Sequence, residues 1–300
     1  MRNGVQEMAD AMDFLAPVLA QNAKLGVKDE GDYYDEEGLL VCGKCHTRRQ
    51  MKINVPTGNG KDTREIKVFT QCKCRQEAEE MAKAERHKAE EADARERQIR
   101  ELKRLSLMDA RLSGNKFSLF QKTDENARNL KLCLRYAEHF DEMLKKNQGL
   151  LMYGTVGTGK SFSAACIANH LLDEGISVMM TSFVRILEVI QGGRESDEAT
   201  LDQMNRVQLL IIDDLGAERG TDFALEKVYN VIDSRYRAKL PIILTTNLTL
   251  EEMKNETEPR YERIYDRIFE MCYPMRYAGL SWRKREANRR YEDMKAFLEG

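Results

Sequence analysis

The sequence predicts an α/β domain, with a parallel sheet flanked by helices, that follows a small cysteine-rich module and a charged helix. Three observations predict this arrangement. Short, continuous apolar runs recur between helix-length segments in the second half of the chain, as is typical of parallel strands buried on both faces. Four cysteines cluster between residues 42 and 74. A run rich in Glu, Ala, Lys and Arg, without Pro or Gly, joins the two regions.

Composition excludes several classes of protein. The chain has 300 residues, and its 48 Lys and Arg nearly balance its 50 Asp and Glu. This balance argues against a uniformly basic nucleic-acid coat and against an acidic tail. No run of about 18 apolar residues is present, and the first thirty residues lack a basic start before an apolar core. We therefore expect neither a membrane span nor a signal peptide, and we expect a cytoplasmic protein.

We expect four zones along the chain. The first is a helical segment over residues 1–30, with Val5, Met8, Met12 and Leu15 on one face and an interruption near Pro17. This helix could pack against its own protein or dock a partner, and the sequence does not distinguish the two. The other zones are a zinc-binding module over residues 31–75, a charged linker helix over 76–112 and the α/β domain over 113–300.

Alternating stretches at 50–55 and 65–70 predict a hairpin in the module, because the turn-rich segment 57–62 joins them. Two cysteine pairs flank this hairpin: Cys42-x-x-Cys45 and Cys72-x-Cys74. Four thiolates would complete a tetrahedral zinc site in a zone with little core of its own. The second pair is tighter than the usual spacing, His46 could replace one thiol, and the alternative is four free cysteines. The remaining three, Cys133, Cys166 and Cys272, are expected in the core.

The linker helix is expected to be solvated. Acid-before-base pairs four residues apart, such as Glu79 with Lys83 and Glu96 with Arg100, support an exposed helix. Its apolar end is expected to dock on the domain that follows, through residues Ile99, Leu102, Leu105 and Leu107. A nucleic-acid role for this run is disfavoured because its charges nearly cancel.

Apolar runs at 149–153, 176–180, 207–212 and 241–244 predict the buried strands. Directly after the first, the segment 154–161 matches the pattern GxxxxGK[ST], and a helical segment follows it. Backbone N–H groups of such a loop surround phosphates, and the helix directs its positive end at the same anion. We expect ATP or GTP to contact Gly154, Thr155, Val156, Gly157, Thr158, Gly159, Lys160, Ser161 and Phe162. Within that set, Lys160 would reach the β- and γ-phosphates, and the Ser161 hydroxyl would bind Mg²⁺.

Polar residues end two later strands. Asp213 and Asp214 close the third apolar run, where unpaired acids would be costly unless they bind something. Asp213 would hold Mg²⁺, and Asp214 would orient or deprotonate the attacking water. Asn247 follows the fourth run, at the edge where ligands of parallel sheets collect. Thr249 and Glu252 form a capping box for the next helix, which leaves Asn247 for the nucleotide.

Three arginines complete the candidate site. Arg263 and Arg267 are four residues apart and share a helix face, which suits a phosphate clamp that acts across a subunit boundary. Arg283 could fold back on the nucleotide. Without an ATP site, the default reading of the first two would be solvated arginines paired with Glu262 or Asp266.

These elements, in this order, resemble the AAA+ ATPase family. Within it, residues from about 115 to 290 resemble helicase loaders of the DnaC and DnaI type and the related IstB transposition helpers. The resemblance is carried by GTVGTGKS at 154–161, LLIIDDLGAE at 209–218, ILTTNLT at 243–249, RIYDRI at 263–268 and GLSWR at 279–283.

The resemblance implies a role for each matching residue. Lys160 and Ser161 would be the Walker A contacts, Asp213 and Asp214 the Walker B acids, and Asn247 the sensor 1 residue. Arg267 would be the arginine finger, with Arg263 beside it, and Arg283 the sensor 2 residue. One position departs from the broad pattern, because the second Walker B residue is usually Glu. The shorter Asp214 side chain implies slower, partner-dependent hydrolysis.

The resemblance also implies single-stranded DNA as a ligand, a replicative DnaB-type hexameric helicase as partner, and self-association through the ATPase domain. The leading hypothesis is therefore an ATP-dependent helicase loader in DNA replication. Side chains between Phe183 and Arg206 are candidates for DNA contact. The alternatives are an IstB-like helper of a transposase, a P-loop small-molecule kinase, and a zinc adaptor that binds ATP without turnover.

Overall fold

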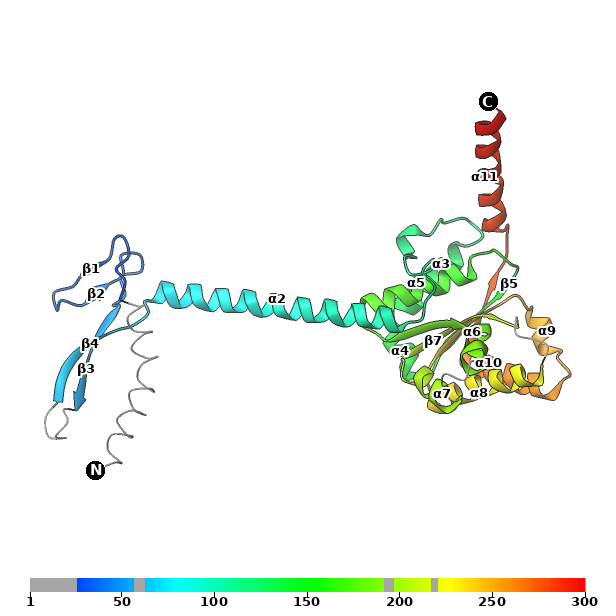
Figure 1. The fold of residues 1–300 in the computed structure, drawn as a ribbon, viewed down its shortest axis with the longest axis horizontal. Helices are drawn as coiled ribbons and strands as arrows, with labels where there is room; N and C mark the ends of the chain where they lie inside the picture. The colour runs from blue at the N-terminus through cyan, green and yellow to red at the C-terminus, as the bar shows by residue number, and fades with distance from the viewer. Residues whose placement is uncertain (1–25, 57–62, 192–196, 217–220, 300) are drawn as a thin grey trace. The chain divides into compact units, whose positions relative to one another are not determined.

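The computed structural model describes residues 26–56, 63–191, 197–216 and 221–299 (Figure 1). The predicted N-terminal helix and the connection of the predicted hairpin lie outside these described residues. The chain divides into two compact units, residues 1–93 and 94–300, and each is described by itself. The four zone boundaries given above stay a prediction. Among the described residues, no helix combines the length and the apolar character that crossing a membrane requires.

The first unit contains two small antiparallel sheets. Strand β1 (Tyr33–Tyr34) pairs with β2 (Leu40–Val41), and β3 (Gln50–Pro56) pairs with β4 (Thr63–Phe69). The second pair is the predicted hairpin, which the structure confirms. Helix α2 (Lys73–Leu105) follows β4 after residues 70–72 and carries the predicted ion pair between Glu79 and Lys83, at 3.0 Å.

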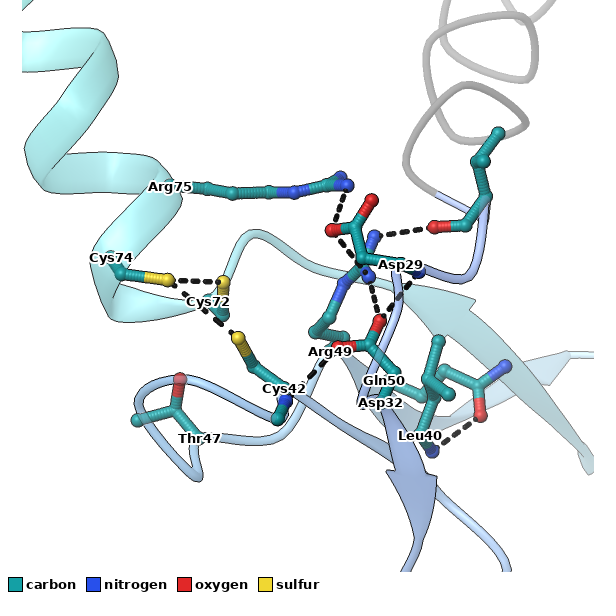
Figure 2. A network of polar contacts seen from close by, with 12 residues as sticks. Asp29, Asp32, Leu40, Cys42, Thr47, Arg49, Gln50, Cys72, Cys74 and Arg75 are labelled. Carbon is teal, nitrogen blue, oxygen red and sulfur yellow. Dashed lines mark hydrogen bonds and ion pairs between the residues drawn. The ribbon is translucent and has the colours of Figure 1, made fainter.

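A buried ion network stabilises the first unit in place of a large apolar core. The Arg49 side chain is fully buried, and its guanidinium pairs with the carboxylates of Asp32 and Asp29. Arg75 on α2 pairs with the same Asp29 at 2.5 Å (Figure 2). Asp32 also accepts a hydrogen bond from the Gly43 N–H, at 3.0 Å. Because buried charges are stable only when paired, this network fixes the chain around the cysteines.

The apolar end of α2 belongs to the second unit and packs there through fewer residues than predicted. Leu102 packs against the core of the second unit. Leu105 and Leu107, however, are 50% and 38% exposed, so the prediction that they dock is wrong. The helix ends at Leu105, and the Ser106 carbonyl accepts a hydrogen bond from the Met180 N–H. After the helix, Met108 and Leu112 also pack against this core.

The second unit is built on a five-stranded parallel sheet in the order β6-β7-β8-β5-β9. Its strands are β5 (Gly149–Gly154), β6 (Val178–Ser182), β7 (Leu209–Leu215), β8 (Ile242–Thr246) and β9 (Cys272–Tyr277). The first four are the predicted strands, and the predicted α/β fold is confirmed. β9 was not predicted. It is an edge strand with Pro274 and exposed Tyr273, so it lacks the continuous apolar run of an internal strand.

Helices cover both faces of this sheet (Figure 1). One core lies beneath α6 (Phe183–Gln191), α7 (Asp197–Asn205), α8 (Asp222–Ala238), α9 (Leu250–Lys254) and α10 (Pro259–Met271). The other lies beneath α3 (Ala127–Glu138), α4 (Phe140–Lys145) and α5 (Lys160–Asp173). Successive residues of a strand enter opposite cores, which explains the uninterrupted apolar runs. The short helix η1 (Phe117–Leu119) and helix α11 (Trp282–Glu299) complete the unit.

The three cysteines predicted in the core, Cys133, Cys166 and Cys272, are all buried. The predicted capping box is also present, because Thr249 accepts from the Glu252 N–H while the Glu252 side chain accepts from the Thr249 N–H. This box starts α9 two residues after Asn247.

Candidate functional site

The candidate nucleotide site lies at the carboxyl ends of the parallel strands. β5 leads into the loop 154–161, β7 ends around Asp213 and Asp214, and β8 is followed by Asn247. Because the strands are parallel neighbours in the order β7-β8-β5, these ends meet at one edge of the sheet. The fold therefore brings the predicted loop, acids and amide together, as expected.

All three glycines of the loop have a positive φ, and two of them show why glycine is required there. Gly154 has φ 129°, and a Cβ there would lie 2.0 Å from the carbonyl oxygen of Tyr277 on β9. Gly159 has φ 97° and precedes the first residue of α5. Between them, the Thr158 hydroxyl donates to the Thr155 carbonyl at 2.8 Å, which closes the loop internally. The loop thus has the backbone freedom to direct its N–H groups at an anion.

The Lys160 ammonium group lies at the centre of the site and is almost fully buried. It donates to the carbonyls of Gly154 and Thr155 and to Asn247 Oδ1, each at 2.8 Å. Burial lowers the pKa of Lys160, whereas the charges of Asp214 and Asp213 raise it. The predicted lysine and the predicted amide are therefore in direct contact.

The two acids lie in a local irregularity of the sheet. The register between β7 and β8 shifts between Ile212 and Leu215, and Asp214 has φ 58°, in the left-handed region. Thr245 on β8 joins both acids: its hydroxyl donates to Asp213 Oδ1 at 2.6 Å and accepts from the Asp214 N–H at 2.9 Å. Desolvation and the charge of Asp213 raise the pKa of Asp214.

The start of α11 approaches the loop, as the prediction for Arg283 requires. The Trp282 N–H donates to the Gly157 carbonyl at 2.9 Å. Arg283 then lines a cavity of about 460 Å³ together with Ser161, Asp213 and Asp214. A second cavity of about 400 Å³ is lined by Lys160, Asn247, Phe162 and again Arg283. The two cavities share Ser161, Asp214 and Arg283. Val156, Gly157 and Gly159 also line the second, whereas Gly154, Thr155 and Thr158 line neither.

Arg263 and Arg267 lie on α10 and do not line these cavities. The Arg267 guanidinium pairs with Asp233 on α8 at 2.7 Å and stacks on Tyr229, with its carbon 4.7 Å from the ring centre. Arg267 is thus held within its own chain, and only 22% of its side chain is exposed. Arg263 is exposed and makes no polar contact with the described residues.

The stretch proposed for DNA contact fits that role poorly. Phe183 is its only aromatic residue and is 1% exposed, in the core, so it provides no stacking surface. Arg185 donates to the Leu107 carbonyl at 3.0 Å. Part of the stretch, residues 192–196, lies outside the described residues.

A candidate metal centre lies in the first unit. The four sulfur atoms all lie within 4.8 Å of one another; they belong to Cys42, Cys45, Cys72 and Cys74. Cys74 Sγ is 3.4 Å from Cys72 Sγ and 3.6 Å from Cys42 Sγ (Figure 2). Zn–S bonds of about 2.3 Å place the sulfurs of a tetrahedral site about 3.8 Å apart. The donor set and its spacing therefore fit zinc.

The start of α2 explains how a closely spaced C-x-C pair can provide two ligands to one metal ion. Cys72 precedes the helix and Cys74 lies in its first turn, so the helical bend brings both thiols to one side. Crowding raises the pKa of Cys74 to about 12, mainly through the neighbouring Cys72 thiol. The Thr47 hydroxyl, 3.0 Å from Cys45 Sγ, is the main cause that lowers the pKa of Cys45 to about 5. A divalent cation would allow all four thiolates to be charged together.

His46 is not part of the cluster. Its Nδ1 lies 3.3 Å from the Tyr33 hydroxyl, so it is engaged on another side of the loop. Sequence reasoning missed two residues, Thr245 and Thr47, that contact the predicted acids and thiols. Their position beside Asn247 and Cys45 is visible in the sequence, but a hydroxyl has no spacing pattern, so only the structure identifies their contacts.

Comparison with known proteins agrees with this architecture. The family described as IstB-like ATP binding protein matches residues 66–290. The replicative helicase loader DnaC of Escherichia coli (strain K12) is 30% identical over 138 residues, which are 45% of this chain and 54% of DnaC. The replicative helicase loader DnaI of Bacillus subtilis (strain 168) is 27% identical over 160 residues, which are 47% of this chain and 51% of DnaI.

A solved structure supports the fold. The crystal structure of DnaI aligns with a TM-score of 0.50 and 23% identity, covering 58% of this chain and 93% of that chain. This likeness shows the fold, and the chain spans about half the length of the curated relatives it matches. Since the family match extends over most of the chain, from the hairpin to α11, this protein belongs to the IstB-like ATP binding protein family.

Proposed function

We propose that this protein is an ATP-dependent helicase loader in DNA replication, in which Mg-ATP acts as a conformational switch. One observation carries the proposal: the Lys160 ammonium group contacts Asn247 at 2.8 Å, at the sheet edge where Asp213, Asp214 and Ser161 line one cavity. Loop, acids and amide thus lie close together and would form one nucleotide site. The similarity to proteins named replicative helicase loaders supports helicase loading as the function.

Each group of the site has a proposed role. The backbone of residues 154–161 would hold the phosphates, and Lys160 the β- and γ-phosphates. Ser161 and Asp213 would hold Mg²⁺, which neutralises charge on the phosphates when bound. Asp214 would position or deprotonate water, Asn247 would orient it, and Arg283 would approach the nucleotide from the first turn of α11. The raised pKa of Asp214 suits a proton acceptor.

To act as an arginine finger on the nucleotide of a neighbouring copy, Arg263 would not have to break a polar contact with the described residues. Its side chain is exposed and makes no such contact. Arg267 would first have to leave Asp233 and Tyr229. We therefore propose that copies associate through the ATPase domain, with Arg263 as the first residue to test as the arginine finger. Arg267 remains the second.

The first unit is proposed to hold one Zn²⁺ through Cys42, Cys45, Cys72 and Cys74 and to bind the replicative DnaB-type helicase. Zinc would fix the loop, the hairpin and the start of α2 as one body, in a unit that otherwise relies on an ion network. Single-stranded DNA is the proposed ligand of the ATPase domain, and the cytoplasm is the proposed location.

A second candidate is an ATPase helper of a transposase, which the family match itself favours. Co-purification with a replicative DnaB-type helicase distinguishes the two, with a transposase of an IstB-bearing element as the competing bait. The loader reading predicts helicase capture, and helicase activity on single-stranded DNA that depends on this protein and ATP. Capture of the transposase alone would refute it.

A further inference from the structure

The acid-bearing end of β7 departs from regular pairing with β8. The ladder pairs Ile212 with Leu244 and then Leu215 with Thr246, so Asp213 and Asp214 stand opposite Thr245 alone. Asp214 has a left-handed backbone, with φ 58°. In such a bulge, the extra residue loses its ladder hydrogen bond and its side chain is re-aimed.

The Thr245 side chain replaces the lost pairing. Thr245 is fully buried, and its hydroxyl accepts from the Asp214 N–H at 2.9 Å while donating to Asp213 Oδ1 at 2.6 Å. A hydroxyl has a single proton, so donation to Asp213 fixes the direction of that proton. One hydroxyl thereby holds the backbone of one acid and the carboxylate of the other.

This arrangement has a consequence for the metal ligand. Asp213 Oδ2 makes no hydrogen bond with the described residues, whereas Oδ1 is held by Thr245. A carboxylate held by one oxygen presents the other in a fixed direction. Such outer contacts orient metal-binding carboxylates and change metal affinity when they are removed.

We propose that Thr245 is a positioning residue: its hydroxyl holds Asp213 in the orientation that binds Mg²⁺ and holds the bulge that separates the two acids. The proposal rests on the proposed ATP site. It predicts that loss of this hydroxyl weakens nucleotide binding only when Mg²⁺ is present, because the nucleotide itself contacts the loop and Lys160.

The neighbouring threonine provides a matched control. Thr246 is also fully buried, and its hydroxyl donates to the Leu215 carbonyl at 2.7 Å and accepts from the Leu248 N–H at 3.1 Å. It contacts no acid through its hydroxyl. Thr246→Val therefore measures the cost of losing a buried hydroxyl on the same strand, beside the same bulge.

The test is an equilibrium titration of full-length protein with a non-hydrolysable ATP analogue, in excess Mg²⁺ and in EDTA. Thr245→Val should lower the Mg²⁺-dependent gain in affinity about tenfold, the size of a hydrogen bond to a charged group. Its affinity in EDTA should match that of the wild type. Thr245→Ser should restore the gain to within about twofold, because it keeps the hydroxyl. Thr246→Val should leave the gain unchanged.

A second pair of variants keeps the test decisive if Thr245→Val folds poorly. Thr245→Ser and Thr245→Cys both lack the methyl group and differ in one atom, and the thiol is a weak donor. The cysteine variant should lose several-fold more of the Mg²⁺-dependent gain than the serine variant, at about the loss expected for Val. Equal gains for Ser and Cys, or equal losses for the two valine variants, would overturn the role of Thr245. If wild-type protein shows no Mg²⁺-dependent gain, the proposed ATP site fails instead.

Discussion

Replacement of Arg235 by methionine should strongly destabilise the ATPase domain. Arg235 lies on α8 and is fully buried, with no carboxylate within ion-pairing distance among the described residues. Its two terminal nitrogens donate to four main-chain carbonyls, with distances between 2.6 and 3.2 Å: those of Met204, Val207, Gln208 and Pro241. The last two directly precede β7 and β8, so one guanidinium fixes the amino ends of the two strands whose carboxyl ends hold the acids and Thr245.

The loss of stability in Arg235→Met can be estimated from these four hydrogen bonds. Each hydrogen bond contributes about 1 kcal/mol net, and a buried carbonyl left without a donor costs at least as much. Methionine fills much of the volume but donates to none of the four acceptors. We therefore expect a loss of about 4 kcal/mol, a large share of the 5–15 kcal/mol typical of a folded domain. In a domain of this size, that loss lowers the midpoint of thermal unfolding by about 8–16 °C.

The assay is urea and thermal unfolding of Arg235→Met followed by circular dichroism. Arg237→Met is the matched control, because Arg237 lies on the same helix, is 73% exposed and only pairs with Asp233 at 2.9 Å. The control should change stability by about 0.5 kcal/mol at most. A loss below about 1 kcal/mol for Arg235→Met would contradict the assignment, since it would mean that water or a shift of the strands satisfies the carbonyls at little cost.

The remaining predictions concern the two sites. Cys42→Ser should lower the zinc content, measured by atomic emission, from one equivalent to below about half, whereas Cys133→Ser should leave it unchanged. A metal-free wild type would count against this prediction. Asp214→Asn should abolish ATP hydrolysis yet raise the unfolding temperature at neutral pH. The raised pKa means that the folded state disfavours the charged carboxylate, so the full cost to stability is present above the raised pKa. This cost declines as the pH falls through that pKa and is absent below the ordinary pKa of a carboxyl group. An unfolding temperature that falls at neutral pH would refute this sign. Arg263→Ala should reduce DNA-stimulated hydrolysis about a thousandfold if its guanidinium acts in trans. Mixing it with a Lys160→Ala chain should then partly restore activity, and no recovery at any ratio would argue against shared sites.

Much of the fold could be predicted from the sequence, because both faces of the internal strands are buried. β5 to β8 are uninterrupted apolar runs for that reason. β9 could not be found this way. As an edge strand it tolerates Pro274 and exposes Tyr273, and its register is set by pairing with β5 rather than by its own pattern. The end of α2 was over-predicted, because helical spacing indicates which residues share a face but not where the helix stops.

In the candidate site, too, local features could be predicted from the sequence, whereas contacts between distant elements could not. The phosphate loop is local in sequence, so its motif alone predicts the strand, loop and helix that the structure contains. The acids and Asn247 were placed correctly because parallel strands end at one edge. The surroundings of Arg267 depend on Asp233 and Tyr229, which lie on another helix, and no spacing within α10 reveals them. Contacts between elements therefore require the structure.

The most direct test of the ATP site is a calorimetric titration of the full-length protein with ATP, in Mg²⁺ and in EDTA, beside its Lys160→Ala variant. We expect saturable binding of one nucleotide per chain that is tighter in Mg²⁺, and a loss of at least about tenfold in affinity without the Lys160 ammonium group. Equal affinities for the two proteins, or no binding by the wild type, would contradict it.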